Sequence, residues 1–325
     1  MDLNQPLAYR MRPKSLDEFV GQEHVIAALQ HSIDNNRIHH AYLLTGTRGI
    51  GKTTIARIIA KCLECEGGIS SHPHLDGNLC STCKAISEGT FPDVIEIDGA
   101  SQTKVDDTRQ LLENTQYPPM QGRYKVYIID EVHMLSISAF NALLKIIEEP
   151  PEHLLFILAT TELHKVPATI LSRCQRFSFR RISQEDIAAR LQYVAYQESI
   201  DLDDGAARVL ARLADGGMRD ALSLLDRCAS YGKKITEELA SDAAGIAGKE
   251  HIYSLVNAIR DRDCTSALEI LNNLYENSCD MERLFSELIS HFRNMMITLT
   301  VPTYKSLILA SDTEAEKIKA QAQSL

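Results

Sequence analysis

Short apolar runs alternate with helical patterns through the first half of the chain. The runs are rich in β-branched and aromatic residues, which is typical of buried strands. The predicted strands are 42–44, 94–97, 126–129, 155–158 and 177–179. The helical patterns between them are 53–62, 106–115 and 138–148. This alternation predicts an α/β fold, with a parallel five-stranded sheet covered by helices on both faces.

After Arg180 the strand pattern fades, and apolar residues recur only at helical spacing, first in 187–194 and then in 207–213. Gly216-Gly217 predicts the end of the second of these helices, and Met218 begins the next. Later apolar stripes predict helices that pack on one another, in 255–259, 268–274 and 285–292. We therefore expect three parts, which are an α/β domain at 1–180, a small helical domain at 181–242 and a helical region at 243–325.

Composition sets broad limits on the function. No apolar run approaches the roughly 18 residues that cross a bilayer, and residues 1–20 contain no signal-peptide core. We therefore expect a cytoplasmic protein without membrane contact. The net charge of −10 argues against a protein that coats DNA with its whole surface, although a local basic face stays open.

A phosphate-binding loop carries the strongest chemical signal. Residues 46–53 read Gly-Thr-Arg-Gly-Ile-Gly-Lys-Thr, the P-loop pattern G-x4-G-K-[ST], directly after a predicted strand and at the start of a predicted helix. Glycines let backbone N–H groups turn toward phosphate oxygens, and the helix N-terminus adds its positive dipole end. Lys52 suits the β- and γ-phosphates, and the Thr53 hydroxyl suits Mg²⁺. The expected ATP contacts in this segment are Gly46, Thr47, Gly49, Ile50, Gly51, Lys52, Thr53 and Thr54. The alternative, a chance glycine-rich turn, is disfavoured by the flanking strand and helix.

The third predicted strand ends in two carboxylates, Asp130 and Glu131. Phosphoryl transfer needs a metal anchor and a group that orients or deprotonates the nucleophile. We expect Asp130 to hold Mg²⁺ and Glu131 to act on the attacking water. The alternative is a strand end with two solvated acids. Because nucleotide binding alone does not require Glu131, its presence favours an ATPase.

Two Cys-x2-Cys pairs, Cys62/Cys65 and Cys80/Cys83, are separated by fourteen residues. Paired knuckles at this spacing predict a closed, tetrahedral structural zinc site. His72 and His74 lie between the pairs, and either one could replace a cysteine, so the ligand set stays open. The alternative is four unrelated thiols.

Several segments resemble the gamma/tau subunits of the bacterial DNA polymerase III clamp loader, which are AAA+ ATPases. The matching segments are Tyr9-Arg10, Arg12-Pro13, 20–24, 103–105, 126–135, 140–145 and 172–174. The resemblance covers residues 1–240 well and the rest weakly. It implies an AAA+ domain at 1–180 with a zinc insertion at about 62–83, a lid at 181–242 and an oligomerisation collar at 243–325. The apolar helices of 243–325 could equally form an internal core. Because relatives continue beyond Leu325, we expect part of the collar to be missing.

The resemblance also assigns roles to single residues. Thr161 matches the first sensor, which detects the γ-phosphate, and Arg173 of Ser-Arg-Cys matches an arginine finger that reaches a neighbouring subunit's ATP. Arg219 matches the second sensor, which extends from the lid, and Val20 with Gly21 matches the adenine-binding segment. The family has a cysteine where this chain has Gly77, so the resemblance supports zinc but not this spacing.

The implied function is that of an ATP-driven motor subunit that opens the ring-shaped sliding clamp (beta) and leaves it closed on primed DNA. Its implied partners are delta, delta-prime and further gamma/tau copies. DNA would be held without sequence specificity through its phosphates, and the candidate contacts are Lys104, Arg109, Arg123 and Lys125. A non-catalytic stator similar to delta-prime is the first alternative, and it would lack a working P-loop. A branch-migration helicase is the second, and the cysteine insertion argues against it.

Overall fold

The computed structural model describes residues 5–74, 79–100, 114–232, 234–243, 249–276, 280–304, 307–308 and 312–325. The chain divides into two compact units. The first comprises Met1–Ser199 and Leu210–Asp226, and the second comprises Ile200–Val209 and Arg227–Leu325.

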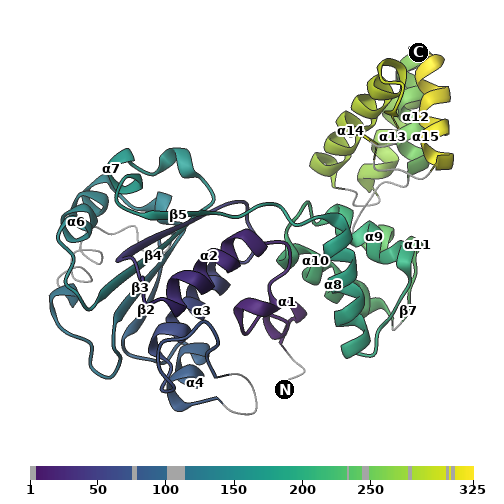
Figure 1. Cartoon of the computed structure of the whole chain (residues 1–325). Helices are drawn as coiled ribbons and strands as arrows, with labels where there is room; N and C mark the ends of the chain where they lie inside the picture. The colour runs from purple at the N-terminus through teal and green to yellow at the C-terminus, as the bar shows by residue number, and fades with distance from the viewer. Residues whose placement is uncertain are drawn as a thin grey trace. The chain divides into compact units, whose positions relative to one another are not determined.

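A five-stranded parallel sheet forms the centre of the first unit, as the alternating pattern predicts (Figure 1). Its strand order is β2-β3-β4-β1-β5. The strands are β1 (Ala41–Thr45), β2 (Val94–Asp98), β3 (Lys125–Asp130), β4 (Leu154–Thr160) and β5 (Gln175–Ser178). Because all of these strands are parallel, their carboxyl ends lie at one edge of the sheet, where ligands of open α/β sheets bind.

The two faces of the sheet are both apolar and both covered by helices. On β1, Tyr42 and Leu44 join the core under α2 (Glu23–Asp34) and α3 (Lys52–Glu64), whereas Ala41 and Leu43 join the core under α6 (Ile137–Glu148) and α7 (Ala168–Leu171). Figure 1 shows these helix pairs on opposite sides of the sheet. Burial on both faces explains why the central strands are continuously hydrophobic rather than alternating.

Two expectations about this unit differ from the structure or lie outside it. The strand predicted at 177–179 runs from Gln175 to Ser178, because edge strand β5 buries only Phe177 and the rest of its pattern is polar. Most of the helix predicted at 106–115 lies outside the described residues, and 114 and 115 belong to a 3-10 turn, η2 (Asn114–Gln116). The other 3-10 turns are η1 (Leu16–Glu18), η3 (Val132–Met134) and η4 (Leu163–Lys165).

The first unit contains further helices besides those that cover the sheet. They include α1 (Leu7–Arg10), α4 (Ser81–Glu88) and α8 (Gln184–Gln197), and the guanidinium of Arg10 donates to both carboxylate oxygens of Glu198 at 2.8 and 3.0 Å. The predicted break at Gly216-Gly217 is confirmed, since α9 (Asp204–Leu213) ends before it and α10 (Met218–Tyr231) begins directly after it.

The second unit is mainly helical. It contains α11 (Glu237–Ala243), α12 (Lys249–Arg260), α13 (Cys264–Glu276), α14 (Met281–Thr300) and α15 (Asp312–Gln323). A short parallel pair that no pattern predicted, β6 (Asp201–Leu202) with β7 (Lys234–Ile235), lies in the same unit. Val256 and Met295 contribute to one core, and Leu274 and Leu284 contribute to another.

Helix-on-helix packing of the predicted stripes is only partly confirmed in this unit. Leu268, Phe285 and Ile289 are 66%, 62% and 68% exposed, although each belongs to a predicted apolar stripe. The apolar face of α14 is wider than the seam that its neighbours cover within the unit. Across the described residues, no helix combines the length and the apolar character that a bilayer crossing requires.

Candidate nucleotide site

The P-loop joins β1 to α3 and contains three glycines at positive φ. Gly51 is the N-cap of α3, with φ +101°, and a Cβ there would lie 2.6 Å from Cε1 of Phe19. An L-residue rarely adopts this backbone conformation, and the ring leaves no room for a side chain. The glycine that the motif requires before Lys52 therefore has both a conformational and a steric reason in this chain.

Lys52 is folded into the loop. Its Nζ donates to the carbonyl oxygens of Gly46 and Thr47, each at 2.8 Å, and the residue is only 6% exposed. Burial lowers the pKa of this ammonium, while the charges of Glu131 and Asp130 oppose the shift. A buried cation with carbonyl partners at a helix N-terminus fits phosphate binding.

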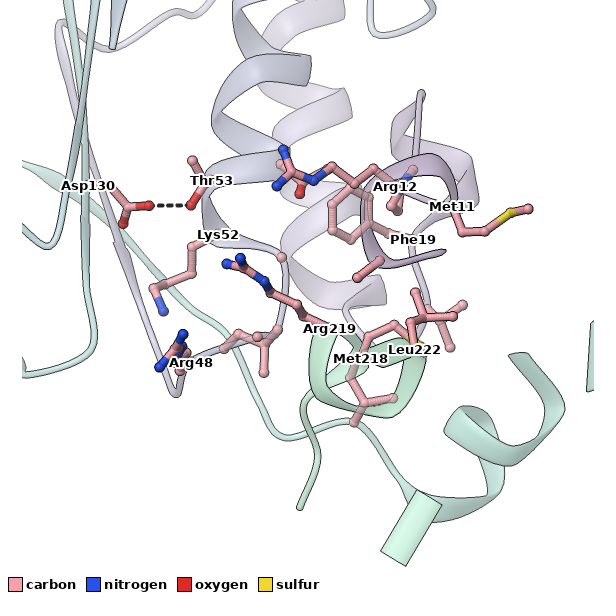
Figure 2. Close-up of a pocket in the computed structure, with 18 of the residues that line it drawn as sticks. Met11, Arg12, Phe19, Arg48, Lys52, Thr53, Asp130, Met218, Arg219 and Leu222 are labelled. Carbon is pink, nitrogen blue, oxygen red and sulfur yellow. Dashed lines mark hydrogen bonds between the residues drawn. The ribbon is translucent and has the colours of Figure 1, made fainter. Parts of the chain in front are cut away.

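Thr53 and Asp130 meet at the mouth of the loop. The Thr53 hydroxyl donates to Oδ2 of Asp130 at 2.5 Å (Figure 2), and Oδ1 of Asp130 accepts the backbone N–H of Glu131 at 2.9 Å. A hydroxyl and a carboxylate are oxygen donors of the kind that Mg²⁺ prefers. The two residues that the sequence assigns to the metal are thus in direct contact.

Glu131 is held by the end of the neighbouring strand β4. Its backbone is left-handed, with φ +45°, and its Oε2 accepts the hydroxyl of Thr161 at 2.9 Å and the backbone N–H of Thr161 at 3.3 Å. The predicted water-activating group and the predicted first sensor therefore form one hydrogen-bonded pair.

His133 belongs to the same cluster, and the sequence reasoning assigned it no role. Its side chain is 6% exposed, with Nδ1 3.0 Å from Oγ1 of Thr160 and 3.3 Å from Oε2 of Glu131. Its Nε2 lies 3.3 Å from Oε1 of Glu162. His133 thus joins the ends of β3 and β4 and helps to position Glu131.

A cavity of about 490 Å³ opens at this edge of the sheet, within the usual size range of ligand sites. Arg12, Arg48 and Arg219 line it together with the P-loop (Figure 2). The backbone N–H of Arg219, in the first turn of α10, donates to the carbonyl oxygen of Gly49 at 3.1 Å. Burial lowers the pKa of Arg12, and the nearby cations Arg57 and Arg219 lower it further. This concentration of positive charge fits a polyanionic ligand.

Most residues predicted from the sequence line this cavity, and some do not. Those that line it are Val20, Gly49, Ile50, Gly51, Lys52, Thr53, Thr54, Asp130, Glu131 and Arg219. Gly46 and Thr47 are not lining residues, but their carbonyl oxygens accept hydrogen bonds from the lining residue Lys52. Thr161 likewise donates to the lining residue Glu131. Gly21 is not among the lining residues, and a Cβ there would lie 3.1 Å from Cγ2 of Ile182.

Arg173 does not line the cavity. Its Nη2 lies 2.7 Å from Oε1 of Glu148, and its Nη1 donates to the carbonyl oxygen of Thr169. Of the proposed DNA contacts, Lys104 and Arg109 lie outside the described residues. Arg123 donates to the carbonyl oxygens of Leu63 and Cys65 at 3.1 and 2.8 Å, so it supports the end of α3.

Other cavity residues were given no role from the sequence, among them Arg12, Phe19 and Arg48. Arg48 occupies a free position of the P-loop pattern, where any residue satisfies the motif. Arg12 and Phe19 come from the N-terminal segment, and a single arginine or phenylalanine far from the motif carries no periodic or spacing signal. Their place at the cavity follows from the tertiary fold alone.

The cysteine segment brings together three of the four predicted ligands. The sulfur atoms of Cys65, Cys80 and Cys83 all lie within 4.8 Å of one another. Burial raises the pKa of the Cys80 thiol, but hydrogen bonds from His74 and the Cys83 backbone outweigh it and lower the pKa to about 6. Cys62 and His74 both lie outside this group, and burial raises the pKa of the Cys62 thiol to about 12.

The sheet order, the P-loop and the strand-end carboxylates define an AAA+ ATPase fold, which uses a nucleotide and Mg²⁺. The chain is similar in fold to the solved Holliday junction branch migration motor RuvB of Thermotoga maritima. The TM-score is 0.54 at 23% identity, covering 76% of this chain and 78% of that one.

Sequence comparison identifies the family. Residues 21–183 match the family described as DNA polymerase III, delta subunit. Residues 186–234 match the ATPase lid domain of the DNA polymerase III clamp loader subunit, and residues 235–325 match domain III of DNA polymerase III subunits gamma and tau.

Curated relatives agree with these matches. The chain is 40% identical to the DNA polymerase III subunit gamma of Buchnera aphidicola subsp. Acyrthosiphon pisum, covering 99% of this chain and 87% of that protein. It is 43% identical to the subunit tau of Bacillus subtilis and 46% identical to that of Escherichia coli, covering 97% and 88% of this chain. It spans 57% and 44% of those tau subunits, about half of their length. This chain belongs to the gamma/tau family of DNA polymerase III clamp loader subunits.

Proposed function

We propose that this chain is an ATP-hydrolysing motor subunit that loads a ring-shaped sliding clamp onto primed DNA. The observation that carries the proposal is the contact between Thr53 and Asp130 at the P-loop mouth, with Glu131 adjacent to it. A stator that only scaffolds the assembly requires neither the metal pair nor the water-activating carboxylate.

The residues divide the chemistry among them. Lys52, with the P-loop N–H groups and the N-terminus of α3, binds the phosphates, and Thr53 with Asp130 would hold Mg²⁺. Mg²⁺ neutralises charge on the phosphate oxygens when it is bound. Glu131 orients the attacking water and accepts its proton, and Thr161 holds that carboxylate. Arg219 contributes positive charge from α10.

Arg173 acts on a neighbouring copy in this proposal. Its absence from the cavity of its own chain supports that assignment, because a cation that completes a neighbour's site must point away from its own. Supplying this cation from another subunit makes hydrolysis depend on assembly. The proposed partners are delta, delta-prime, further gamma/tau copies, the clamp and primer–template DNA. The division into domains at 1–180, 181–242 and 243–325 also remains a proposal.

The test is ATP hydrolysis by a loader reconstituted from this chain, delta and delta-prime, with and without clamp and primed DNA. We expect clamp plus DNA to stimulate hydrolysis, and Lys52→Ala to reduce it at least about 100-fold, as removal of a transition-state donor does. Lys84→Ala on α4, whose side chain is 67% exposed, is the matched control and should change little. A lack of both nucleotide binding and turnover in every assembly would overturn the motor function and leave the stator as the function.

We also propose that the cysteine segment holds a structural zinc ion. The chemistry of the donors supports this, because clustered thiols are the usual ligands of such a site. Zinc would fix the loop by closing a tetrahedral site, without any part in hydrolysis. The chain, prepared without added metal, should contain about one zinc ion per molecule, measured by elemental analysis.

A further inference from the structure

The three clustered cysteines leave the fourth zinc ligand to be identified, and two kinds of residue compete for it. The spacing of the Cys-x2-Cys pairs nominates Cys62. The other candidates among the described residues are His72 and His74, which lie on the segment between the pairs. The question rests on the zinc site proposed above and concerns which side chain completes it.

His74 lies beside the cysteine group and contacts Cys65 directly. Its Nδ1 lies 3.3 Å from the sulfur of Cys65, and its ring is also hydrogen-bonded to the side chain of Cys80. Two of the three clustered thiols thus already share this imidazole. Gly67 leaves room for the ring, because a Cβ there would lie 3.2 Å from Cε1 and 3.3 Å from Nε2 of His74.

Cys62 is engaged elsewhere. Its sulfur donates to the carbonyl oxygen of Ser71 at 3.7 Å, and its side chain is fully buried in the apolar core between the sheet and α2 and α3. Cys62 lies inside α3, whereas Cys65 is the C-cap, where ψ is +133° and the chain leaves the helix. Helical geometry therefore directs Cys62 into the core, while Cys65 turns toward the loop.

The second cysteine pair has the local geometry that the first pair lacks. Cys80 is the N-cap of α4 in extended conformation, and its sulfur accepts the backbone N–H of Cys83 at 3.4 Å. Both sulfurs therefore face the same side of the turn. The shared motif Cys-x2-Cys is a metal-binding turn at 80–83 and an ordinary helix end at 62–65.

His72 is excluded by its own contacts. Its Nε2 lies 3.3 Å from Oδ2 of Asp17, its Nδ1 lies 2.9 Å from Oγ of Ser71, and its side chain is 64% exposed. Both ring nitrogens therefore face partners outside the cysteine group.

The backbone of Cys65 is held by a hydrogen bond from Arg123. The guanidinium of Arg123 donates to the carbonyl oxygens of Leu63 and Cys65, and the carboxylate of Glu64 accepts the backbone N–H groups of Arg123 and Tyr124 at 2.6 and 2.8 Å. The end of α3 is thus anchored to the segment that enters β3. Cys65 is positioned as a ligand by contacts that Cys62 does not share.

We infer that this chain binds its structural zinc through Cys65, Cys80, Cys83 and His74, and that Cys62 is a core residue. Three thiolates and one imidazole are an established structural zinc set. The fourth ligand is therefore a histidine that precedes the second cysteine pair. Both cysteines of the 80–83 pair bind zinc, whereas only Cys65 of the 62–65 pair does.

The experiment measures zinc content and cobalt spectra of the full chain and of four variants. Cys62→Ser should keep about one zinc per chain, whereas Cys83→Ser and His74→Ala should lose zinc or bind it at least about 10-fold more weakly. His74→Cys should restore binding. In the Co²⁺-substituted protein it should move the d–d bands to longer wavelength, because thiolate is a weaker-field ligand than imidazole.

The outcomes separate this inference from the zinc proposal itself. Loss of zinc from Cys62→Ser while nucleotide binding persists would overturn the assignment and restore the four-cysteine set. Unchanged zinc affinity and spectrum in His74→Ala would also overturn it. If neither zinc nor Co²⁺ binds the wild-type chain, the zinc site fails, and the ligand assignment fails with it. ATP binding by Cys62→Ser serves as the folding control.

Discussion

The nucleotide pocket and the cysteine cluster lie at the two ends of one helix, yet the chain specifies them in different ways. α3 begins at Lys52 in the P-loop and ends at Glu64, directly before Cys65. At about 1.5 Å per residue, its thirteen residues separate the two ends by about 20 Å. The N-terminal site is a contiguous motif with fixed backbone conformation. The C-terminal site collects side chains from the C-cap of α3 and from the N-cap and first turn of α4.

This difference explains why residue spacing specifies the geometry at one end of α3 more completely than at the other. In a P-loop, each residue of the motif acts through the backbone geometry of its immediate neighbours, so spacing is sufficient. In the cysteine segment, spacing counts Cys62 and Cys65 as a pair. The helix that contains Cys62 nevertheless directs its sulfur into the core, outside the group that the sulfur atoms of Cys65, Cys80 and Cys83 form.

The largest effect should come from a single methyl group in the P-loop. Gly51→Ala places a Cβ 2.6 Å from the Phe19 ring at φ +101°. We expect nucleotide affinity to fall at least about 100-fold, because both strain and a steric clash displace the loop. Gly89→Ala is the matched control, since Gly89 is also left-handed at φ +70° but a Cβ there meets nothing within 4 Å. Isothermal titration with ATP measures both variants, and equal losses would contradict the steric argument.

Metal removal should destabilise the cysteine segment at the C-terminal end of α3 and leave the P-loop at its N-terminal end unchanged. Chelation of the full chain should destabilise the cysteine segment by several kcal/mol, on the order of a structural zinc site. Proteolysis within 66–79 should accelerate, while ATP affinity should change less than about three-fold, because the P-loop is held by β1, α3 and Phe19. Limited proteolysis with and without chelator measures the cleavage rate within 66–79. The protection that added ATP gives under both conditions reports whether ATP still binds. A parallel loss of ATP binding would show that the two sites are coupled through the helix.

Within the nucleotide pocket, the hydroxyl of Thr161 should matter more for turnover than for binding. Thr161→Val removes the donor that holds Glu131 at 2.9 Å. We expect kcat to fall about 10- to 100-fold, with nucleotide affinity nearly unchanged, since this contact orients a group that acts in the transition state. Thr161→Ser keeps the hydroxyl and should retain most of the activity in the reconstituted loader. A loss of affinity equal to the loss of kcat would count against the positioning role.

The smallest effect should follow a change in the middle of α3. Arg57 donates to both carboxylate oxygens of Glu96 at 2.5 and 2.7 Å, and its side chain is 28% exposed. Arg57→Gln should lower the free energy of unfolding by about 1 kcal/mol or less, as is usual for partly exposed ion pairs. Chemical denaturation measures the stability, while zinc content and ATP affinity should stay at wild-type values. Changes at both ends would mean that the helix transmits strain.

Much of the fold was determined by the sequence alone. Five apolar runs, the helices at 53–62 and 138–148 and the break at Gly216-Gly217 were predictable, because periodicity and turn chemistry are local properties. The same holds for Lys52, Thr53, Asp130 and Glu131, since a motif on a strand end or a helix start fixes their direction. The contact between Thr53 and Asp130 follows once β1 and β3 lie in one parallel sheet.

Only the tertiary structure decided which distant side chains meet. His133 meets Thr160 and Glu162 because β3 and β4 are neighbours in the sheet, and Arg12 reaches the pocket because the N-terminal segment folds over the P-loop side. Cys62 lies within α3, and the helix directs its sulfur into the core. Cys65 is the C-cap, where the chain leaves the helix, and its sulfur contacts His74 instead. Strand register, helix phase and loop path depend on the packing of the whole core, so residue spacing does not contain them.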